Sequence, residues 1–233
     1  MPDRASRDLP ELLGLLFQLH PWHGLSAGPD APAVVSVFIE LVPDDTLKYE
    51  IDKASGFLKV DRPQRYSSLS PVPYGFIPRT FCAAAVAAIA ERATGREGLR
   101  GDQDPLDICV LTERAINHGG VIVRARPIGG LRVFDGADVD DKIVAVLDND
   151  PAYSEWRELT DCPAVFVDRI HHYFQTYKDM PDAVHPRSEV ADHYGAAVAL
   201  EVIRAAQDDY RARYGDLERS LAEATSIRMT GRS

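Results

Sequence analysis

Apolar and polar residues are arranged along the middle of the chain in patterns typical of β-strands. The run Val34–Leu41 is rich in β-branched residues and predicts a strand. Residues 47–51 and 58–61 flank a polar stretch that ends in Gly56, which predicts a β-hairpin. Further strands are expected at residues 106–111, 120–127, 130–134 and 142–147.

Helical patterns surround this strand-rich region, mainly toward the C-terminus. The alanine-rich segment Ala83–Ala93 predicts a helix. Apolar positions recur at helical spacing in residues 163–178 and 190–214, and a short amphipathic helix is expected at Leu12–Leu19. Residues 63–79 contain four prolines and predict an irregular loop.

Strands in the middle and helices near the end favour an α+β fold with a small antiparallel barrel. A length of 233 residues, 45% of them apolar, suits one compact domain with appended helices. We therefore interpret residues 1–31 as an N-terminal extension, residues 32–215 as a single barrel domain and residues 216–233 as a polar tail.

The charge balance and the cysteines narrow the possible partners and location. The chain has 36 acidic and 26 basic residues, a net charge of -10, which disfavours binding to nucleic acid or to anionic membranes. Three widely spaced cysteines without a CxxC pair argue against a disulfide framework or a zinc site and favour a cytoplasmic protein. The longest apolar run, Cys82–Ala90, is far shorter than the ~20 residues that cross a bilayer.

Two groups of aspartates carry the main candidate chemistry. Residues 102–107 read DQDPLD and place Asp102, Asp104 and Asp107 within six positions. Hard divalent cations such as Mg²⁺ prefer oxygen ligands, and a bound cation offsets the repulsion between neighbouring carboxylates. A second acidic group follows at Asp135, Asp138, Asp140 and Asp141. The two groups predict a metal site.

Cationic and phenolic side chains are expected at strand ends, turns and a helix end around these acids. They are Lys48, Arg62, Lys142, Tyr177 and Lys178. Arginine can hold a phosphate group with two hydrogen bonds and lysine can hold it as a point charge. Metals, cations and a spare carboxylate that accepts a proton from water together indicate a phosphoryl-transfer site.

These residues belong to a series of motifs that resembles the soluble, Mg²⁺-dependent (family I) inorganic pyrophosphatases. The D-x-D-P-x-D motif is residues 102–107. Matching segments lie, in the family's order, at residues 39–43, 48–53, 60–62, 73–78, 126–129, 135–142 and 172–179. The resemblance covers about residues 34–180, and the shared order of eight motifs makes it specific.

The resemblance implies a small five-stranded antiparallel (OB-like) β-barrel flanked by C-terminal helices. It implies hydrolysis of pyrophosphate to two orthophosphates, with several Mg²⁺ ions per active site and Mn²⁺ or Zn²⁺ as possible substitutes. It also implies a homo-oligomer, either a dimer or a hexamer.

The resemblance assigns roles to individual residues as well. Asp104 is the implied general base, and Tyr74 and Arg62 complete the catalytic group. The implied metal ligands are Asp102, Asp107, Asp135, Asp140 and Glu40. The implied substrate-binding residues are Lys48, Arg62, Lys142, Tyr177 and Lys178, and Glu50 and Asp61 support them.

Two segments depart from the family pattern. Ser70 stands four positions before Tyr74, where the family usually has a second tyrosine, so we expect altered substrate binding. Residues 82–100 are interpreted as an insertion.

Alternative interpretations remain. The substitution at Ser70 motivates a non-catalytic pyrophosphate- or nucleotide-binding protein on the same fold. An oligonucleotide-binding barrel is disfavoured by the net charge. A calcium loop is disfavoured because Asp107 occupies the position that requires glycine. Asp138 and Asp141, taken alone, are expected on a solvated face.

Overall fold

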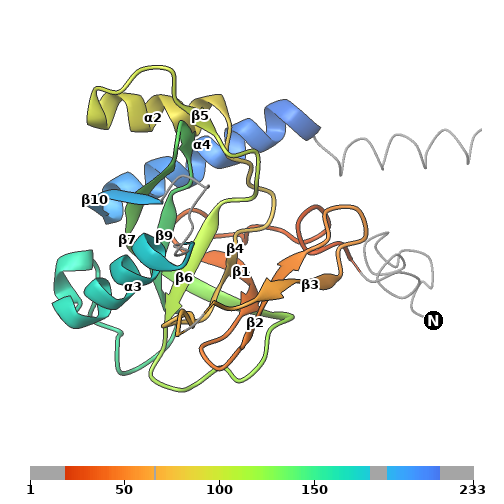
Figure 1. Cartoon of the computed structure of the whole chain (residues 1–233), viewed down its shortest axis with the longest axis vertical. Helices are drawn as coiled ribbons and strands as arrows, with labels where there is room; N and C mark the ends of the chain where they lie inside the picture. The colour runs from red at the N-terminus through yellow and green to blue at the C-terminus, as the bar shows by residue number, and fades with distance from the viewer. Residues whose placement is uncertain (1–18, 66, 179–187, 216–233) are drawn as a thin grey trace, which may run out of the picture.

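The computed structural model of this chain describes residues 19–65, 67–178 and 188–215 (Figure 1). The helix expected at Leu12–Leu19 lies outside these ranges except for its last residue, and the polar tail 216–233 lies outside them entirely. None of the helices in the described ranges combines the length and the apolar character needed to cross a bilayer.

Within the described residues, five strands close into a ring. In spatial order they are β1 (Val35–Leu41), β4 (Tyr74–Phe76), β6 (Asp107–Leu111), β9 (Lys142–Leu147) and β7 (Val121–Asp135). Pairing of β7 with β1 completes the ring. The expected small, OB-like five-stranded barrel within an α+β fold is therefore confirmed, but the expectation that it is wholly antiparallel is wrong. Strands β6 and β9 run parallel. The long strand β7 follows β6 and precedes β9 in the sequence, and it carries the chain back across the ring before β9 begins.

The parallel pair β6–β9 is covered on both faces, which explains its unbroken apolar sequence. On β6, Ile108 and Val110 belong to a core shared with α2 (Ala84–Thr94) and α4 (Ala196–Tyr214). The alternate residues Cys109 and Leu111 belong to a second core against α3 (Ala164–Thr176). Figure 1 shows α2 and α4 together at one end of the molecule and α3 on another side.

The expected strands 120–127 and 130–134 form one continuous strand, β7, with an irregularity between Pro127 and Gly129. The glycines at this point allow another strand to approach closely. A Cβ on Gly129 would lie 2.4 Å from the Tyr194 carbonyl oxygen, and one on Gly130 would lie 2.5 Å from the Tyr194 ring. Any side chain here would therefore displace residue 194.

That approaching strand corrects the expected helix at residues 190–214. Residues Glu189–Gly195 form strand β10, which pairs antiparallel with β7, and α4 begins only at Ala196. The apolar spacing of the first residues fits a helix as well as a strand, and pairing with the bare glycine backbone of β7 decides the outcome.

The predicted hairpin is confirmed as a separate two-stranded sheet. Strand β2 (Leu47–Ile51) pairs antiparallel with β3 (Leu58–Pro63), and Lys48 lies opposite Arg62. The polar turn of the β2–β3 hairpin was predicted correctly from its sequence.

The loop expected at residues 63–79 contains the short strand β4, which follows Pro73.

The remaining segments pack onto the ring. Short strand β5 (Arg100–Gly101) pairs parallel with β8 (Asp138–Val139), and a single 3₁₀ turn, η1, occupies Leu159–Asp161. In the N-terminal segment, Trp22 is buried and its indole Nε1 donates to the Thr80 carbonyl at 2.8 Å. The described part of this extension is thus joined to the barrel.

Candidate active site

A cavity of about 340 Å³ lies between the β2–β3 hairpin and the near ends of the ring strands. Its lining residues are Glu40, Lys48, Glu50, Ile51, Lys53, Arg62, Tyr74, Asp102, Asp104, Pro105, Asp107, Asp135, Asp138, Asp140, Lys142, Tyr177 and Lys178. Every candidate site residue from the sequence is in this set except Asp61. Segments that are distant in the sequence are therefore brought together in one place.

The loop 102–107 directs three carboxylates into this cavity. Asp102 Oδ1 accepts a hydrogen bond from the Asp104 backbone N–H at 3.0 Å, which closes a tight turn. Gln103, between them, has a φ of 65°, in the left-handed region. Pro105 then interrupts backbone pairing, and β6 begins at Asp107. The turn and the start of the strand together aim Asp102, Asp104 and Asp107 at one volume.

The parallel pairing of β6 and β9 places their first residues side by side. Asp107 is the register partner of Lys142, whose side chain is almost fully buried. Lys142 Nζ contacts carboxylate oxygens of both Asp107 and Asp140, and the Tyr74 hydroxyl donates to Asp107. Burial disfavours the ammonium, but Asp107 and Asp140 outweigh this effect and raise the pKa of Lys142 well above its usual value.

Crowding and burial work against ionisation of several of these acids. Burial, with the nearby charge of Asp140, raises the pKa of Asp102 to about 9. Burial, with the charge of Asp107, raises the pKa of Glu40 to about 8, although Glu40 accepts the Ile51 N–H at 2.6 Å. A cation bound among these groups would restore their charged forms at neutral pH.

The donor set suits a hard, hydrated divalent cation. The acidic side chains that line the cavity are all Asp or Glu, whose carboxylate oxygens are the kind of ligand that Mg²⁺ binds. Across the described ranges, no three His, Cys, Asp or Glu side chains are already gathered as a metal-coordinating set. Lys142 lies between two of these carboxylates, those of Asp107 and Asp140. A ready-made set of three side chains is not required, because Mg²⁺ usually keeps several water ligands and needs only one or two carboxylates.

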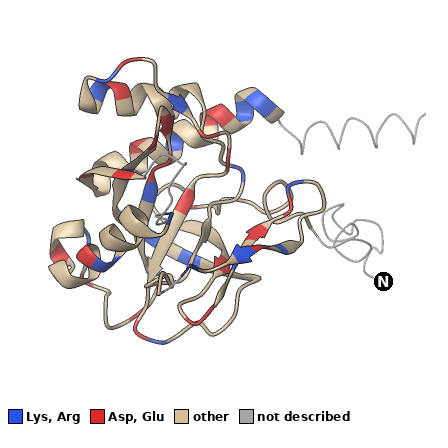
Figure 2. Cartoon of the chain, viewed as in Figure 1, with Lys and Arg blue, Asp and Glu red and all other residues tan. Residues whose placement is uncertain are grey.

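The hairpin supplies the opposite, cationic wall of the cavity, and Figure 2 shows acidic and basic positions along it. Lys48 contacts Glu50 and lies 3.8 Å from Asp61. Arg62 contacts the same Asp61, so this acid, outside the cavity lining, holds two cations of the hairpin, Lys48 and Arg62. Acids next to each cation keep the hairpin charges fixed in place.

A further cation reaches the cavity from the end of α3. Lys178 Nζ donates to Asp135 Oδ2 at 2.6 Å. Burial opposes its charge, but Tyr177, Asp140 and Asp135 raise the pKa of Lys178 to about 12. The cavity thus combines oxygen ligands for metal ions with fixed positive groups for an anion rich in oxygen.

Comparison with known proteins is consistent with this chemistry. The family model described as inorganic pyrophosphatase matches residues 37–211. The chain belongs to the inorganic pyrophosphatase family. The match includes the hairpin, the loop 102–107, the strands of the ring and most of α4.

Individual members of the inorganic pyrophosphatase family resemble the chain over most of its length. It is 44% identical over 200 residues to an inorganic pyrophosphatase of Chlamydia caviae, covering 84% of this chain and 93% of that protein. It is 36% identical over 177 residues to a soluble inorganic pyrophosphatase of Zea mays, covering 76% of this chain and 74% of that protein. The crystal structure of inorganic pyrophosphatase from Thermus thermophilus superposes with a TM-score of 0.69 at 30% identity, covering 82% and 99% of the two chains.

Sequence reasoning did not assign a role to two charged residues that line the cavity of this pyrophosphatase-family protein. Lys53, in the hairpin turn, contacts Asp104. Asp138, expected on a solvated face, lines the cavity and pairs with Arg100. Both lie inside matching motifs, at residues 48–53 and 135–142, and Asp138 also belongs to the second acidic group.

Asp141 corrects a second expectation, because it is buried rather than solvated. Its Oδ1 lies 3.1 Å from Nε of the equally buried Arg132, and Tyr194 donates to its Oδ2 at 3.1 Å. Burial raises the pKa of Asp141 to about 6 despite the opposing charge of Arg132. The Arg132 guanidinium also lies over the Tyr194 ring. This buried group joins β7, β10 and the turn that carries Asp140.

Ser70, where the family pattern has a tyrosine, does not line the cavity. Its side chain is buried, and its hydroxyl donates to the Val72 carbonyl at 2.7 Å. The residue therefore closes the loop before β4, and the expected alteration of substrate binding has no support in its position.

We expect Ser70→Ala to lower the free energy of unfolding by about 1 kcal/mol, because it leaves the Val72 carbonyl without its donor. The KM for substrate should stay within twofold of the wild-type value. Urea denaturation and steady-state kinetics measure the two effects. A several-fold change in KM without loss of stability would show that Ser70 acts on the substrate after all.

Proposed function

We propose that this protein catalyses metal-dependent hydrolysis of inorganic pyrophosphate to two orthophosphates. The observation that carries the proposal is the composition of the cavity. Eight carboxylates and five Lys or Arg side chains line its described wall, so that both signs of charge face one small volume. A doubly phosphorylated anion that arrives with divalent cations fits this pattern better than any apolar or singly charged ligand.

We propose Mg²⁺ as the metal, with Mn²⁺ or Zn²⁺ as substitutes. Asp102, Asp107 and Asp140 would hold the activating ions, and Asp135 would join Asp140 in holding metal that arrives with substrate. Glu40 would act at longer range, through water. Mg²⁺ ions bound there would lower the pKa of the attacking water and offset the charge of the phosphates.

The side chains of the protein do the remaining work. Lys48, Arg62, Lys142, Tyr177 and Lys178 bind the two phosphoryl groups and hold them in line with the attacking water. Asp104, half-exposed at the cavity, accepts the proton of that water as general base.

Three residues support this arrangement. Tyr74 fixes Asp107 through its hydroxyl donor, Asp61 orients Lys48 and Arg62, and Glu50 pairs with Lys48. Their contacts give Asp107, Lys48 and Arg62 a defined direction before the substrate arrives.

A purely pyrophosphate- or nucleotide-binding role has lost the observation that motivated it, since Ser70 lies outside the cavity lining. We also propose a cytoplasmic location, which the free, buried state of Cys82, Cys109 and Cys162 supports. Assembly into a homo-oligomer remains a proposal drawn from the family resemblance.

Phosphate release from pyrophosphate by the purified protein tests the function. Rapid release is expected with millimolar Mg²⁺ and none above background after chelation with EDTA. Asp102→Asn should lower release by about 100-fold, because it removes a direct ligand charge, and even outer-sphere partners cost 10- to 100-fold. Asp192→Asn, the same change at an exposed aspartate outside the cavity, is the matched control and should keep normal activity. Release that persists in EDTA, or in Asp102→Asn, would contradict the proposal.

A further inference from the structure

The backbone of the loop 102–107 is held by the segment that precedes α2. The Cys82 N–H donates to the Asp104 carbonyl at 2.9 Å, and the Gln103 N–H donates to the Cys82 carbonyl at 3.0 Å. A Cβ on Gly101 would lie only 2.2 Å from the Cys82 carbonyl oxygen. The two segments therefore touch backbone to backbone at the position where Asp102 and Asp104 emerge.

Thr80 fixes the other end of the same loop. Its buried hydroxyl accepts the Leu106 N–H at 2.9 Å and donates to the Ile77 carbonyl at 2.6 Å. Pro105 has no N–H, so Leu106 provides the first backbone donor after the turn. Residues 80–82 thus contact the loop on both sides of Pro105.

Helix α4 in turn holds this segment in place. The Phe81 N–H donates to the Ala206 carbonyl of α4 at 2.9 Å. One turn later, the Asp209 carboxylate accepts the backbone N–H groups of Ala83 at 2.9 Å, Ala85 at 3.1 Å and Val86 at 3.2 Å. Ala83, at the N-cap position of α2, has no side-chain oxygen to cap the helix itself, so Asp209 supplies the cap from another helix.

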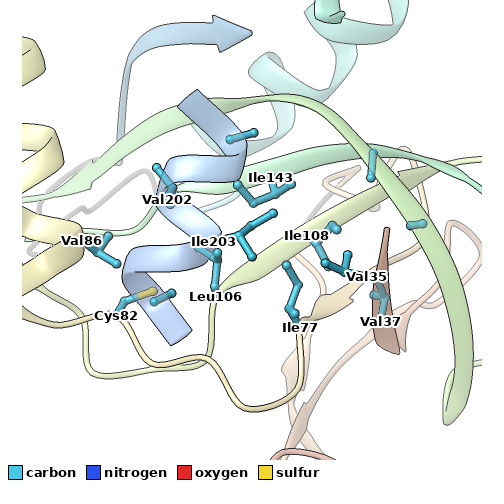
Figure 3. Close-up of a cluster of buried hydrophobic side chains, with 14 of the residues drawn as sticks. Val35, Val37, Ile77, Cys82, Val86, Leu106, Ile108, Ile143, Val202 and Ile203 are labelled. Carbon is cyan, nitrogen blue, oxygen red and sulfur yellow. The ribbon is translucent and has the colours of Figure 1, made fainter. Parts of the chain in front are cut away.

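Apolar packing runs along the same route. Figure 3 shows Cys82, Val86 and Leu106 around α4, with Ile203 beside Leu106. Asp209 itself is buried, with about 9% of its surface exposed. A buried carboxylate that satisfies three backbone donors fixes the position of the segment more strictly than apolar contact alone.

We propose that Asp209 is a positioning residue for the metal-binding loop 102–107 and that it acts through residues 80–83. The inference rests on the proposed function, because it assigns metal binding to Asp102 and Asp107. Asp209 touches neither metal nor substrate. Its loss leaves three N–H groups without an acceptor, and the segment that carries Cys82 and Thr80 then shifts against the loop. A metal site tolerates displacements of only about 0.5 Å, so metal affinity should report the shift.

The test measures binding of Mn²⁺ to the full chain without substrate, by the electron paramagnetic resonance signal of free Mn²⁺. Asp209→Ala should raise the Kd for Mn²⁺ about tenfold and raise the Mg²⁺ concentration at half-maximal hydrolysis to a similar extent. Val35→Ala, a buried change on β1 away from the loop, serves as the stability control. It should lower the melting temperature comparably and keep the Kd for Mn²⁺ within twofold.

Further variants keep the inference testable if Asp209→Ala does not fold. Asp209→Asn keeps one acceptor oxygen and should give a smaller rise in Kd. Thr80→Val removes the hydroxyl that accepts the Leu106 N–H of the loop and should weaken Mn²⁺ binding. Thr80→Ser keeps this hydroxyl and should preserve the binding. Unchanged Mn²⁺ affinity in the folded Asp209 variants would overturn the inference and leave the proposed function standing. A wild-type protein that binds no Mn²⁺ would overturn the proposed metal site and this inference with it.

Discussion

Asp104→Asn is expected to lower kcat for pyrophosphate hydrolysis by about 10²- to 10⁴-fold, the usual contribution of a positioned general base. The amide cannot accept the proton of the attacking water. The loop should keep its shape, because the bond from Cys82 is made to the backbone carbonyl of residue 104. Mn²⁺ titration and stopped-flow phosphate release would separate retained metal binding from lost turnover.

Asp138→Asn provides the matched control for that experiment. It is the same chemical change at another aspartate of the cavity, but Asp138 pairs with the exposed Arg100. Its kcat should fall less than tenfold. If Asp104→Asn hydrolysed pyrophosphate at a near-normal rate, the general base would have to be another carboxylate of the cavity.

The second large effect is expected on stability. Asp141→Asn should lower the free energy of unfolding at pH 8 by about 3–5 kcal/mol, because it leaves the buried Arg132 charge without its partner. At this pH the wild-type carboxylate is ionised, since its pKa is about 6. Guanidinium denaturation followed by circular dichroism measures the change.

The double variant Arg132→Met with Asp141→Leu tests whether the loss comes from the unpaired charge. Replacing both partners by apolar groups of similar size removes the buried charge altogether, so it should be less destabilising than Asp141→Asn alone. A double variant that is less stable than the single one would show that the geometry of the pair, rather than its charge, holds β7 and β10 together.

Four of the five ring strands could be predicted because their sequence is dominated by burial, whereas β4 lies inside the segment 63–79 that was expected to be a loop. The apolar run that became β6 fits no exposed element, and its flanking Pro105 and acids mark where it begins. Strand β10 could not be predicted in the same way. The spacing of Val190 and Tyr194 suits a helix, and only contact with the glycines of β7 makes it a strand. The decisive information lay more than 50 residues earlier in the sequence.

The same distinction holds for the site. The carboxylates of the loop 102–107 can be recognised from six consecutive residues, and the hydrogen bond that closes its tight turn joins Asp102 and Asp104, which are neighbours in the sequence. Asp141 is different, because its burial depends on contacts with Arg132 on β7 and with Tyr194 on β10. Lys53 reaches Asp104 only because the hairpin folds over the cavity. Pairings between distant segments are what sequence patterning does not contain.

The separate sheet of the hairpin has a consequence for how the two walls of the cavity move. Strands β6 and β9 are paired on both sides and covered on both faces, so their amides should open to solvent only when the whole domain unfolds. Strands β2 and β3 pair only with each other in the described chain and are mostly half-buried or exposed. They can open locally at lower free energy. Asp107 and Lys142 therefore stand on the part of the protein that is most resistant to local opening, and Lys48 and Arg62 stand on a part that can open locally.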